Sequence, residues 1–217
     1  MIRAILFDFD DTLGNREVYA YRCYQSLVLP YVESEDPYLR ETILQDCMLY
    51  DQRGNTNKEY VRKRIEKEYG LSLPYQDMND TWERNLWKYA VLFEDALETL
   101  EYLKPKYQLG IITNGNRIGQ KKKIENSGLM RFFDSSQIIV SEDVGFRKPD
   151  PEIFLLMCER FRVRPEECVF VGDTYSTDIL GAIRAGMTPV WMKQQRNRPN
   201  ESGVIEISEI SDLEKYY

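Results

Sequence analysis

Short runs of apolar residues recur along the chain and set its predicted architecture. Four of them lack the alternation of a half-exposed strand, which is typical of parallel strands covered on both faces. A fifth run and a weaker sixth follow towards the C-terminus. The six predicted strands are Ala4–Phe7, Leu109–Ile112, Ile138–Val140, Val169–Val171, Thr188–Met192 and Val204–Ile207.

Amphipathic segments separate these runs from about residue 93 onward. A clear example is Asp178–Ala185, with Gly186 as its expected C-cap. Its helical spacing predicts that Ile179, Ala182 and Ile183 are buried. Alternating strands and helices predict right-handed βαβ units. The fold class is therefore α/β, with a doubly wound, Rossmann-like and mostly parallel sheet.

Residues 14–92 break this alternation. Val61, Ile65 and Tyr69 follow helical spacing, and no run in the segment has the character of a strand. We therefore predict a Rossmann-like core made of residues 1–13 and 93–217, with an inserted all-helical cap of residues 14–92. The many aromatic residues of the insertion are expected to form the core of a small helical bundle, with a minority facing a ligand.

Charge and the absence of one residue type narrow the chemistry. The formal charge of the 217 residues is −7, which argues against a nucleic-acid surface and gives no reason to expect binding to an anionic membrane. Histidine is absent, which excludes Ser-His-Asp catalysis, Cys-His catalysis and histidine-based zinc sites. Whatever chemistry occurs must use carboxylates, lysine, hydroxyls or a bound ion.

The lack of a recognisable targeting signal and the spacing of the cysteines predict a reducing compartment. The N-terminal apolar run is too short for a secretory signal, and no stretch approaches the roughly 20 apolar residues of a membrane span. The four cysteines contain no C-x-x-C pair, so we expect reduced thiols and a cytoplasmic protein.

Aspartates follow two of the predicted strands. Asp8 and Asp10 follow the first strand, and Asp173 and Asp178 follow the fourth. In an open α/β sheet, ligands bind beyond the carboxyl ends of the strands. Each acid alone could equally cap a turn or a helix. Together they would place up to four negative charges around one pocket, so a phosphate dianion could enter only with a cation, and one Mg²⁺ would offset two charges.

Three further polar residues are expected beside these acids. Thr113 and Asn114 precede Gly115 at the end of the second strand, where they suit an oxyanion cradle, although Asn-Gly is also a common turn. Lys148 lies on a proline-flanked loop, and its compact charge suits a phosphate oxygen, although it could also be a solvated loop lysine. Lys148 would offset a third acidic charge, and a proton on one acid would remove the fourth.

In this order the motifs resemble those of the haloacid dehalogenase superfamily. The match consists of D-x-D-x-T at Asp8–Thr12, then Thr113, then Lys148, and finally G-D-x-x-x-x-D at 172–178. The helical insertion resembles the small cap of that family. The stretches around the motifs look most like the phosphatase branch that holds nucleotide 5′-phosphatases and N-acylneuraminate-9-phosphatase. Asp10 favours phosphoryl transfer, because the family's dehalogenases lack an aspartate at that position.

The resemblance implies a magnesium-dependent phosphatase that hydrolyses small phosphate monoesters, nucleotide or sugar phosphates, through an aspartyl-phosphate. Asp8 would be the nucleophile, and Asp10 the general acid and then the general base. Thr113, the N–H of Asn114 and Lys148 would bind the phosphate oxygens. The implied Mg²⁺ ligands are Asp8, Asp10 through its backbone carbonyl, Asp173, and Asp178 directly or through water.

Other functions share parts of this pattern. A phosphosugar mutase would carry the same motifs, and a bisphosphate activator would reveal it. A phospho-acceptor or a binding protein without turnover is a further alternative. The expected partner is a small-molecule phosphate substrate, and we expect a monomer or a weak homodimer.

Overall fold

The computed structural model describes residues 1–193 and 199–217. The chain divides into two compact units, which we call the core unit (residues 1–15 and 92–217) and the helical unit (residues 16–91). None of the helices in the described residues is long and apolar enough to cross a membrane.

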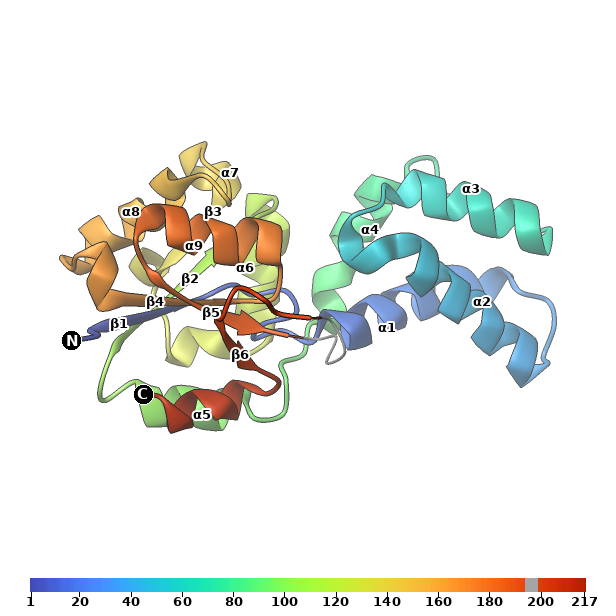
Figure 1. The fold of residues 1–217 in the computed structure, drawn as a ribbon. Helices are drawn as coiled ribbons and strands as arrows, with labels where there is room; N and C mark the ends of the chain where they lie inside the picture. Colours follow the sequence, from blue (N-terminus) through green and yellow to red (C-terminus); the bar gives the residue numbers. More distant parts are fainter. Residues whose placement is uncertain (194–198) are drawn as a thin grey trace. The chain divides into compact units, whose positions relative to one another are not determined.

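The described strands of the core unit form one parallel sheet, in the order β3-β2-β1-β4-β5-β6 (Figure 1). The predicted α/β class and the predicted strand positions are confirmed, with ends that differ by one residue at most. The strands are β1 Ala4–Phe7, β2 Gln108–Thr113, β3 Ile138–Val140, β4 Cys168–Gly172, β5 Thr188–Met192 and β6 Ile205–Ile207.

Helices cover both faces of this sheet, which explains why its strands are apolar without alternation. Successive side chains of a strand point to opposite faces of the sheet. On one face, Ile5 and Phe7 of β1 pack with α5 and α6. On the other face, Ala4 and Leu6 pack with α8 and α9. In Figure 1, α8 and α9 lie on one side of the strands and α5 on the other. The bounds are α5 Ala96–Leu103, α6 Arg117–Asn126, α7 Ser141–Val144, α8 Pro151–Phe161 and α9 Leu180–Ala185.

The helix predicted at Asp178–Ala185 differs in part from the structure. It starts as one π-helical turn, Tyr175–Ile179, and continues as α9. Gly186 is the left-handed C-cap that the sequence predicts, with φ of 83°. Ile183, however, is 48% exposed, so its predicted burial was wrong. The wider π turn rotates the following helical face, because it holds more residues per turn than an α-helix.

The helical unit is built around its own core. Tyr24 and Trp82 are buried, with ring centroids 4.4 Å apart, and they pack with Val61 and Ile65. This agrees with the predicted aromatic bundle core, although Tyr38 is 83% exposed. The helices are α1 Arg16–Val28, α2 Pro37–Asp51, α3 Lys58–Tyr69 and α4 Met78–Leu86.

A buried ionic cluster joins three helices of this unit. The Asp51 carboxylate accepts hydrogen bonds from Arg16 Nη1 at 2.8 Å and from the Tyr24 hydroxyl at 2.9 Å, and Lys58 Nζ lies 2.5 Å away. Burial alone would raise the pKa of Asp51, but Arg16 and Lys58 outweigh it and lower that pKa. Burial lowers the pKa of Lys58, and Asp51 only partly reverses this. The cluster therefore depends on the Asp51 charge.

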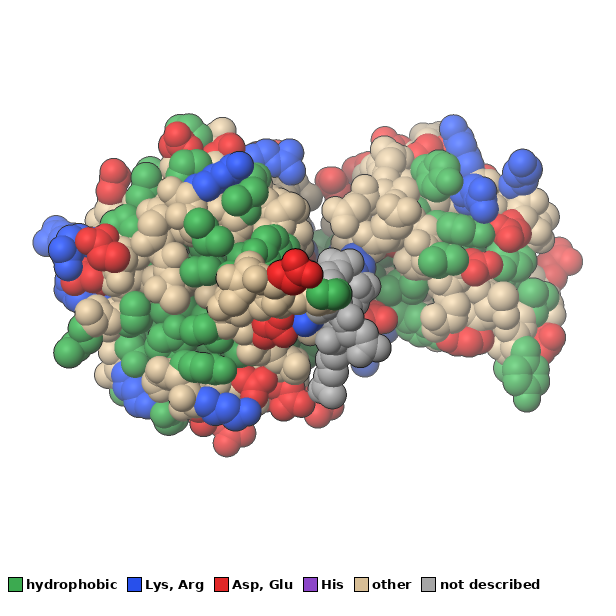
Figure 2. All heavy atoms as spheres, in the orientation of Figure 1, with side chains coloured by type: hydrophobic (Ala, Val, Ile, Leu, Met, Phe, Trp, Pro, Cys, Tyr) green, Lys and Arg blue, Asp and Glu red, His purple; other side chains and the backbone are tan. Residues whose placement is uncertain are grey.

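The structure also shows where the charged side chains and the cysteines lie. On the face shown in Figure 2, acidic and basic side chains are interspersed among hydrophobic and other ones. The cysteines Cys23, Cys47, Cys158 and Cys168 are free and buried.

Candidate active site

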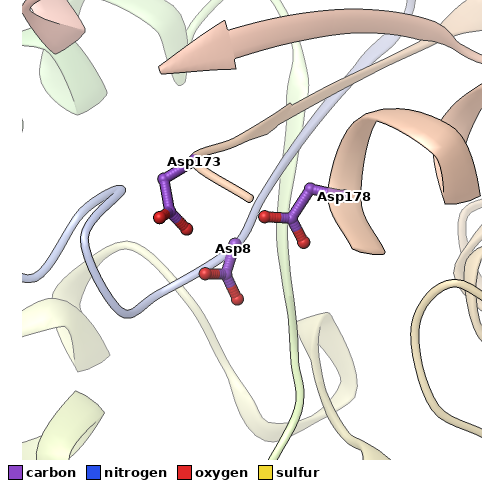
Figure 3. Close-up of side chains that lie close together, drawn as sticks. All are labelled: Asp8, Asp173 and Asp178. Carbon is purple, nitrogen blue, oxygen red and sulfur yellow. The ribbon is translucent and has the colours of Figure 1, made fainter. Parts of the chain in front are cut away.

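The polar strand ends meet at one edge of the sheet. β1 lies between β2 and β4, and Asp8, directly after β1, donates its N–H to the Val171 carbonyl at 2.9 Å. The carboxylates of Asp8, Asp173 and Asp178 offer oxygens that all lie within 4.8 Å of one another. Figure 3 shows these three side chains converging. The sequence thus predicted that Asp8, Asp173 and Asp178 lie together. The parallel pairing of β1 with β4 brings the ends of these two strands to the same edge of the sheet.

Lys148 lies inside this cluster. Its Nζ atom is 2.6 Å from Oδ1 of Asp8 and 2.7 Å from Oδ1 of Asp178, and the residue is 3% exposed. The Asn114 side chain fixes the lysine backbone: its Oδ1 accepts the Lys148 N–H at 2.9 Å, and its Nδ2 donates to the Lys148 carbonyl at 3.0 Å. Asn114 therefore holds the lysine loop, a side-chain contact that the sequence did not predict.

Asp178 reaches the cluster because a glycine makes room for it. Asp178 is buried in the π-helical turn, and its Oδ2 accepts a hydrogen bond from the N–H of Thr174 at 2.9 Å. A Cβ atom at Gly172 would lie 2.4 Å from the Asp178 Cβ, a distance that no side chain tolerates. The glycine of the G-D-x-x-x-x-D motif is thus explained by close approach rather than by backbone conformation.

The electrostatics of the cluster favour a bound cation. Burial raises the pKa of Asp8 to about 7; Lys148 opposes this shift, and the negative charges of Asp178 and Asp10 add to it. Burial alone would lower the pKa of Lys148, but the carboxylates of Asp178 and Asp8 outweigh it and raise that pKa. The lysine is therefore the charged partner, and Asp8 gains a proton readily unless a further positive charge is near.

The donor set fits a hard divalent ion. The cluster of Asp8, Asp173 and Asp178 offers carboxylate oxygens as ligands, and Lys148 supplies a single positive charge against these three acids. Mg²⁺ prefers oxygen ligands and is typically held by one or two carboxylates together with waters and phosphate oxygens. The residues present therefore fit the predicted magnesium.

The Asp10 carboxylate is not one of the three that form this oxygen cluster, and it has partners of its own on α6. Lys123 Nζ is 2.5 Å from its Oδ1 and 2.6 Å from its Oδ2, and Gln120 Nε2 donates to Oδ2 at 2.9 Å. The sequence-based prediction gave Asp10 two roles, proton transfer by its side chain and a metal contact by its backbone carbonyl. The structure assigns partners to the side chain, and the metal contact stays a prediction.

Three further residues at this sheet edge were not predicted from the sequence. Gln120 and Lys123 contact Asp10, and Trp191 donates its indole Nε1–H to the Asp173 carbonyl at 2.8 Å. Gln120 and Lys123 lie three residues apart on α6, which places both on one helical face. That spacing was the available signal, but the polar run 120–123 is more typical of a solvated surface.

Comparison with known proteins places this geometry in a family. Residues 2–186 match the family of haloacid dehalogenase-like hydrolases. The chain belongs to the haloacid dehalogenase-like hydrolases. This confirms the resemblance inferred from the motif order. The matched range includes the Asp8, Asp173 and Asp178 cluster just described and the strands β1 to β4 that position it.

Two relatives of this chain are named as phosphatases. The glyceraldehyde 3-phosphate phosphatase of Methanothermobacter thermautotrophicus is 31% identical over 233 aligned positions, which cover 99% of each chain. The human N-acylneuraminate-9-phosphatase is 28% identical, with 95% of this chain and 86% of the relative covered. By this similarity the chain is a phosphatase of the haloacid dehalogenase-like hydrolases.

A solved structure of a related protein contains magnesium. The HAD-hydrolase YfnB of Bacillus subtilis, crystallised bound to magnesium, is 27% identical with a TM-score of 0.70, and the alignment covers 99% of this chain and 97% of that one. A magnesium-bound relative of this fold agrees with the oxygen cluster at Asp8, Asp173 and Asp178.

Proposed function

We propose that this chain hydrolyses small phosphate monoesters, phosphorylated sugars first, through an aspartyl-phosphate on Asp8. The observation that carries the proposal is the contact of Asp8 with Lys148 at 2.6 Å inside the oxygen cluster. Sugar phosphates come first because the named relatives act on glyceraldehyde 3-phosphate and on an N-acylneuraminate 9-phosphate.

Asp8 is the proposed nucleophile. Its carboxylate oxygen forms a bond to phosphorus while the bond from phosphorus to the leaving oxygen breaks, so one difficult displacement becomes two easier ones. Asp8, Asp173 and Asp178 would hold the magnesium ion, whose positive charge would keep Asp8 ionised and screen the phosphate oxygens. Lys148 supplies a further charge to the phosphate in the transition state.

Asp10 is the proposed proton carrier. Its carboxyl group gives a proton to the leaving oxygen in the first step. In the second step a water oxygen attacks phosphorus, Asp10 takes a proton from that water, and the bond between phosphorus and Asp8 breaks. Thr113, at the end of β2, and the N–H of Asn114 complete the proposed phosphate cradle.

A substrate panel tests the proposal. Glyceraldehyde 3-phosphate, N-acetylneuraminate 9-phosphate, nucleoside monophosphates and flavin mononucleotide are compared by phosphate release, with Asp8→Asn as the matched control of equal shape. We expect turnover of a phosphorylated sugar by the wild type and loss of turnover by Asp8→Asn. Wild-type rates that depend on an added bisphosphate, with phosphate moved and not released, would instead indicate a mutase.

The setting of this activity also stays a proposal. We expect a monomer or weak homodimer in the cytoplasm. Size-exclusion chromatography with light scattering measures the oligomeric state directly, and a stable higher oligomer would contradict the expectation.

A further inference from the structure

Helix α6 places a second buried lysine beside the site. We propose that Lys123 and Gln120 are positioning residues that hold the Asp10 carboxylate for proton transfer to the leaving oxygen. The inference rests on the proposed function, in which Asp10 carries that proton. It adds two residues, from an element outside the motifs, to the machinery of the reaction.

The contacts hold both oxygens of Asp10. Lys123 Nζ lies 2.5 Å from Oδ1 and 2.6 Å from Oδ2, while Gln120 Nε2 donates to Oδ2 at 2.9 Å. Hydrogen bonds between charged partners are short and roughly twice as strong as neutral ones. A carboxylate held at both oxygens loses the freedom to rotate about its last torsion, so the pair fixes its orientation.

Burying the Lys123 ammonium group costs free energy, because the group loses its contact with water. Lys123 is only 5% exposed, whereas the side chain of Asp10 keeps 24% of its surface accessible. A buried ammonium is expensive to desolvate, and its attraction to one partner often does no more than offset that cost. The same helix carries Lys122 on its exposed side, so the sequence could have placed this charge in water. A lysine turned inward against Asp10 is better explained by the chemistry of Asp10 than by stability.

Gln120 also ties Asp10 to the phosphate-binding loop. Its Nε2 donates both to Asp10 and, at 2.9 Å, to the carbonyl of Asn114, whose side chain holds Lys148. Gly115 leaves the space for this amide, because a Cβ there would lie 2.7 Å from Nε2. One amide thus sets the distance between the proton carrier and the residues that hold the phosphate.

Such positioning matters in both steps. The proton must pass between an Asp10 oxygen and the leaving oxygen in the first step, and between water and Asp10 in the second, each within hydrogen-bond reach. Lys123 meets the ionised carboxylate, which is the form left after the first step and needed at the start of the second. Misplacement of a reacting group by about 1 Å can cost about a hundredfold in rate.

Two aryl esters separate positioning of the acid from a structural role. The leaving group 2,4-dinitrophenolate departs without a proton, whereas phenolate departs more readily when it receives one. We therefore compare kcat/KM for 2,4-dinitrophenyl phosphate and phenyl phosphate, since kcat/KM reports the step in which the leaving group departs. The variants are Lys123→Met, Gln120→Leu, the conservative Lys123→Arg, and Asp10→Asn as reference. Lys122→Met removes the same charge from the exposed side of the helix.

The expected result is a selective loss. Lys123→Met and Gln120→Leu should lower kcat/KM for phenyl phosphate roughly 10- to 100-fold, with a much smaller effect on the dinitrophenyl ester. Asp10→Asn should show the same selectivity, Lys123→Arg should recover part of the loss, and Lys122→Met should match the wild type. If Lys123→Met does not fold, Gln120→Leu, which removes no charge, decides the question.

The contrary results are distinct. Equal losses on both esters, or a selective Asp10→Asn beside unselective Lys123 and Gln120 variants, would overturn the positioning role and leave the proposed function standing. A wild type that cleaves neither ester nor any phosphate of the substrate panel would overturn the proposed function itself.

Discussion

Lys148 and Asp8 form a buried ion pair, with Nζ 2.6 Å from Oδ1, although 140 residues separate them in the chain. The pair forms because the loop before α8 and the end of β1 meet at the same edge of the sheet. The lysine is also 2.7 Å from Asp178, so one ammonium serves two carboxylates. Its removal would leave both acids buried without that partner.

We predict that Lys148→Met lowers turnover strongly. The loss should be about 10²–10³-fold in kcat, the usual effect of removing one group that stabilises developing negative charge. Lys148→Arg should not restore activity, because a planar guanidinium does not fit a site built for a compact ammonium. Steady-state kinetics with 4-nitrophenyl phosphate measures both, with Lys122→Met as the control of equal charge change. An active Lys148→Met variant would contradict the role of Lys148.

Metal removal should affect activity and stability together. Chelation is expected to abolish turnover and added Mg²⁺ to restore it. Because a ligand that binds only the folded state stabilises it, Mg²⁺ at 100 times its Kd should add about 2.7 kcal/mol to the free energy of unfolding. Thermal unfolding of the wild type and of Asp173→Asn, which lacks one ligand charge, measures this. Full activity in excess chelator would exclude the site as described.

The buried cluster of the helical unit predicts a pH-dependent stability. The pKa of Asp51 is lowered below its usual 3.8 by Arg16 and Lys58. A lowered carboxyl pKa means that the stabilisation is complete above about pH 4, where the unfolded group is ionised, and is lost as pH falls through the folded pKa. Removing the carboxylate leaves buried cations, so Asp51→Ala should cost about 3–5 kcal/mol at pH 7.

Urea unfolding followed by circular dichroism checks this prediction. Glu83→Ala, an exposed acid on α4, is the matched control and should change stability little. The difference between wild type and Asp51→Ala should shrink as the pH is lowered below 4. An Asp51→Ala protein as stable as the wild type at pH 7 would show that the cluster contributes nothing net.

Substrate size gives a further prediction. The helical insertion follows the Asp8–Thr12 motif directly in the sequence, and from that position we predict a site that admits only small monoesters. Phosphorylated sugars should therefore be hydrolysed faster than a phosphopeptide or a folded phosphoprotein, measured as phosphate release at equal concentration. Faster turnover of either large substrate would contradict the prediction.

Much of the core unit follows from the sequence, for a physical reason. Buried parallel strands need unbroken apolar runs, and their carboxyl ends lie at one edge, so the pattern of the chain is enough to place Asp8 and Asp173 together. Lys148 was found by its chemistry and its stiff loop. These inferences depend on local pattern and on topology, both of which the sequence encodes strongly.

The features that the sequence did not predict depend on which face of a helix is turned towards the core. Gln120 and Lys123 stand in a polar run, and only the packing of α6 shows that this face turns inward to Asp10. Ile183 was wrongly placed in the core, because the π-helical turn before α9 shifts the helical face and leaves no clear mark in the sequence. Side-chain pairing across elements is a tertiary property.

The most direct test of the account is chemical capture of the intermediate. Wild-type protein is mixed with Mg²⁺ and a substrate that it turns over, quenched within one turnover, and treated with borohydride, which reduces an acyl phosphate to the alcohol. Peptide mass spectrometry should then find homoserine at position 8, dependent on substrate and absent from Asp8→Asn. Continued turnover with residue 8 unmodified, or the modification at another carboxylate, would contradict the aspartyl-phosphate on Asp8.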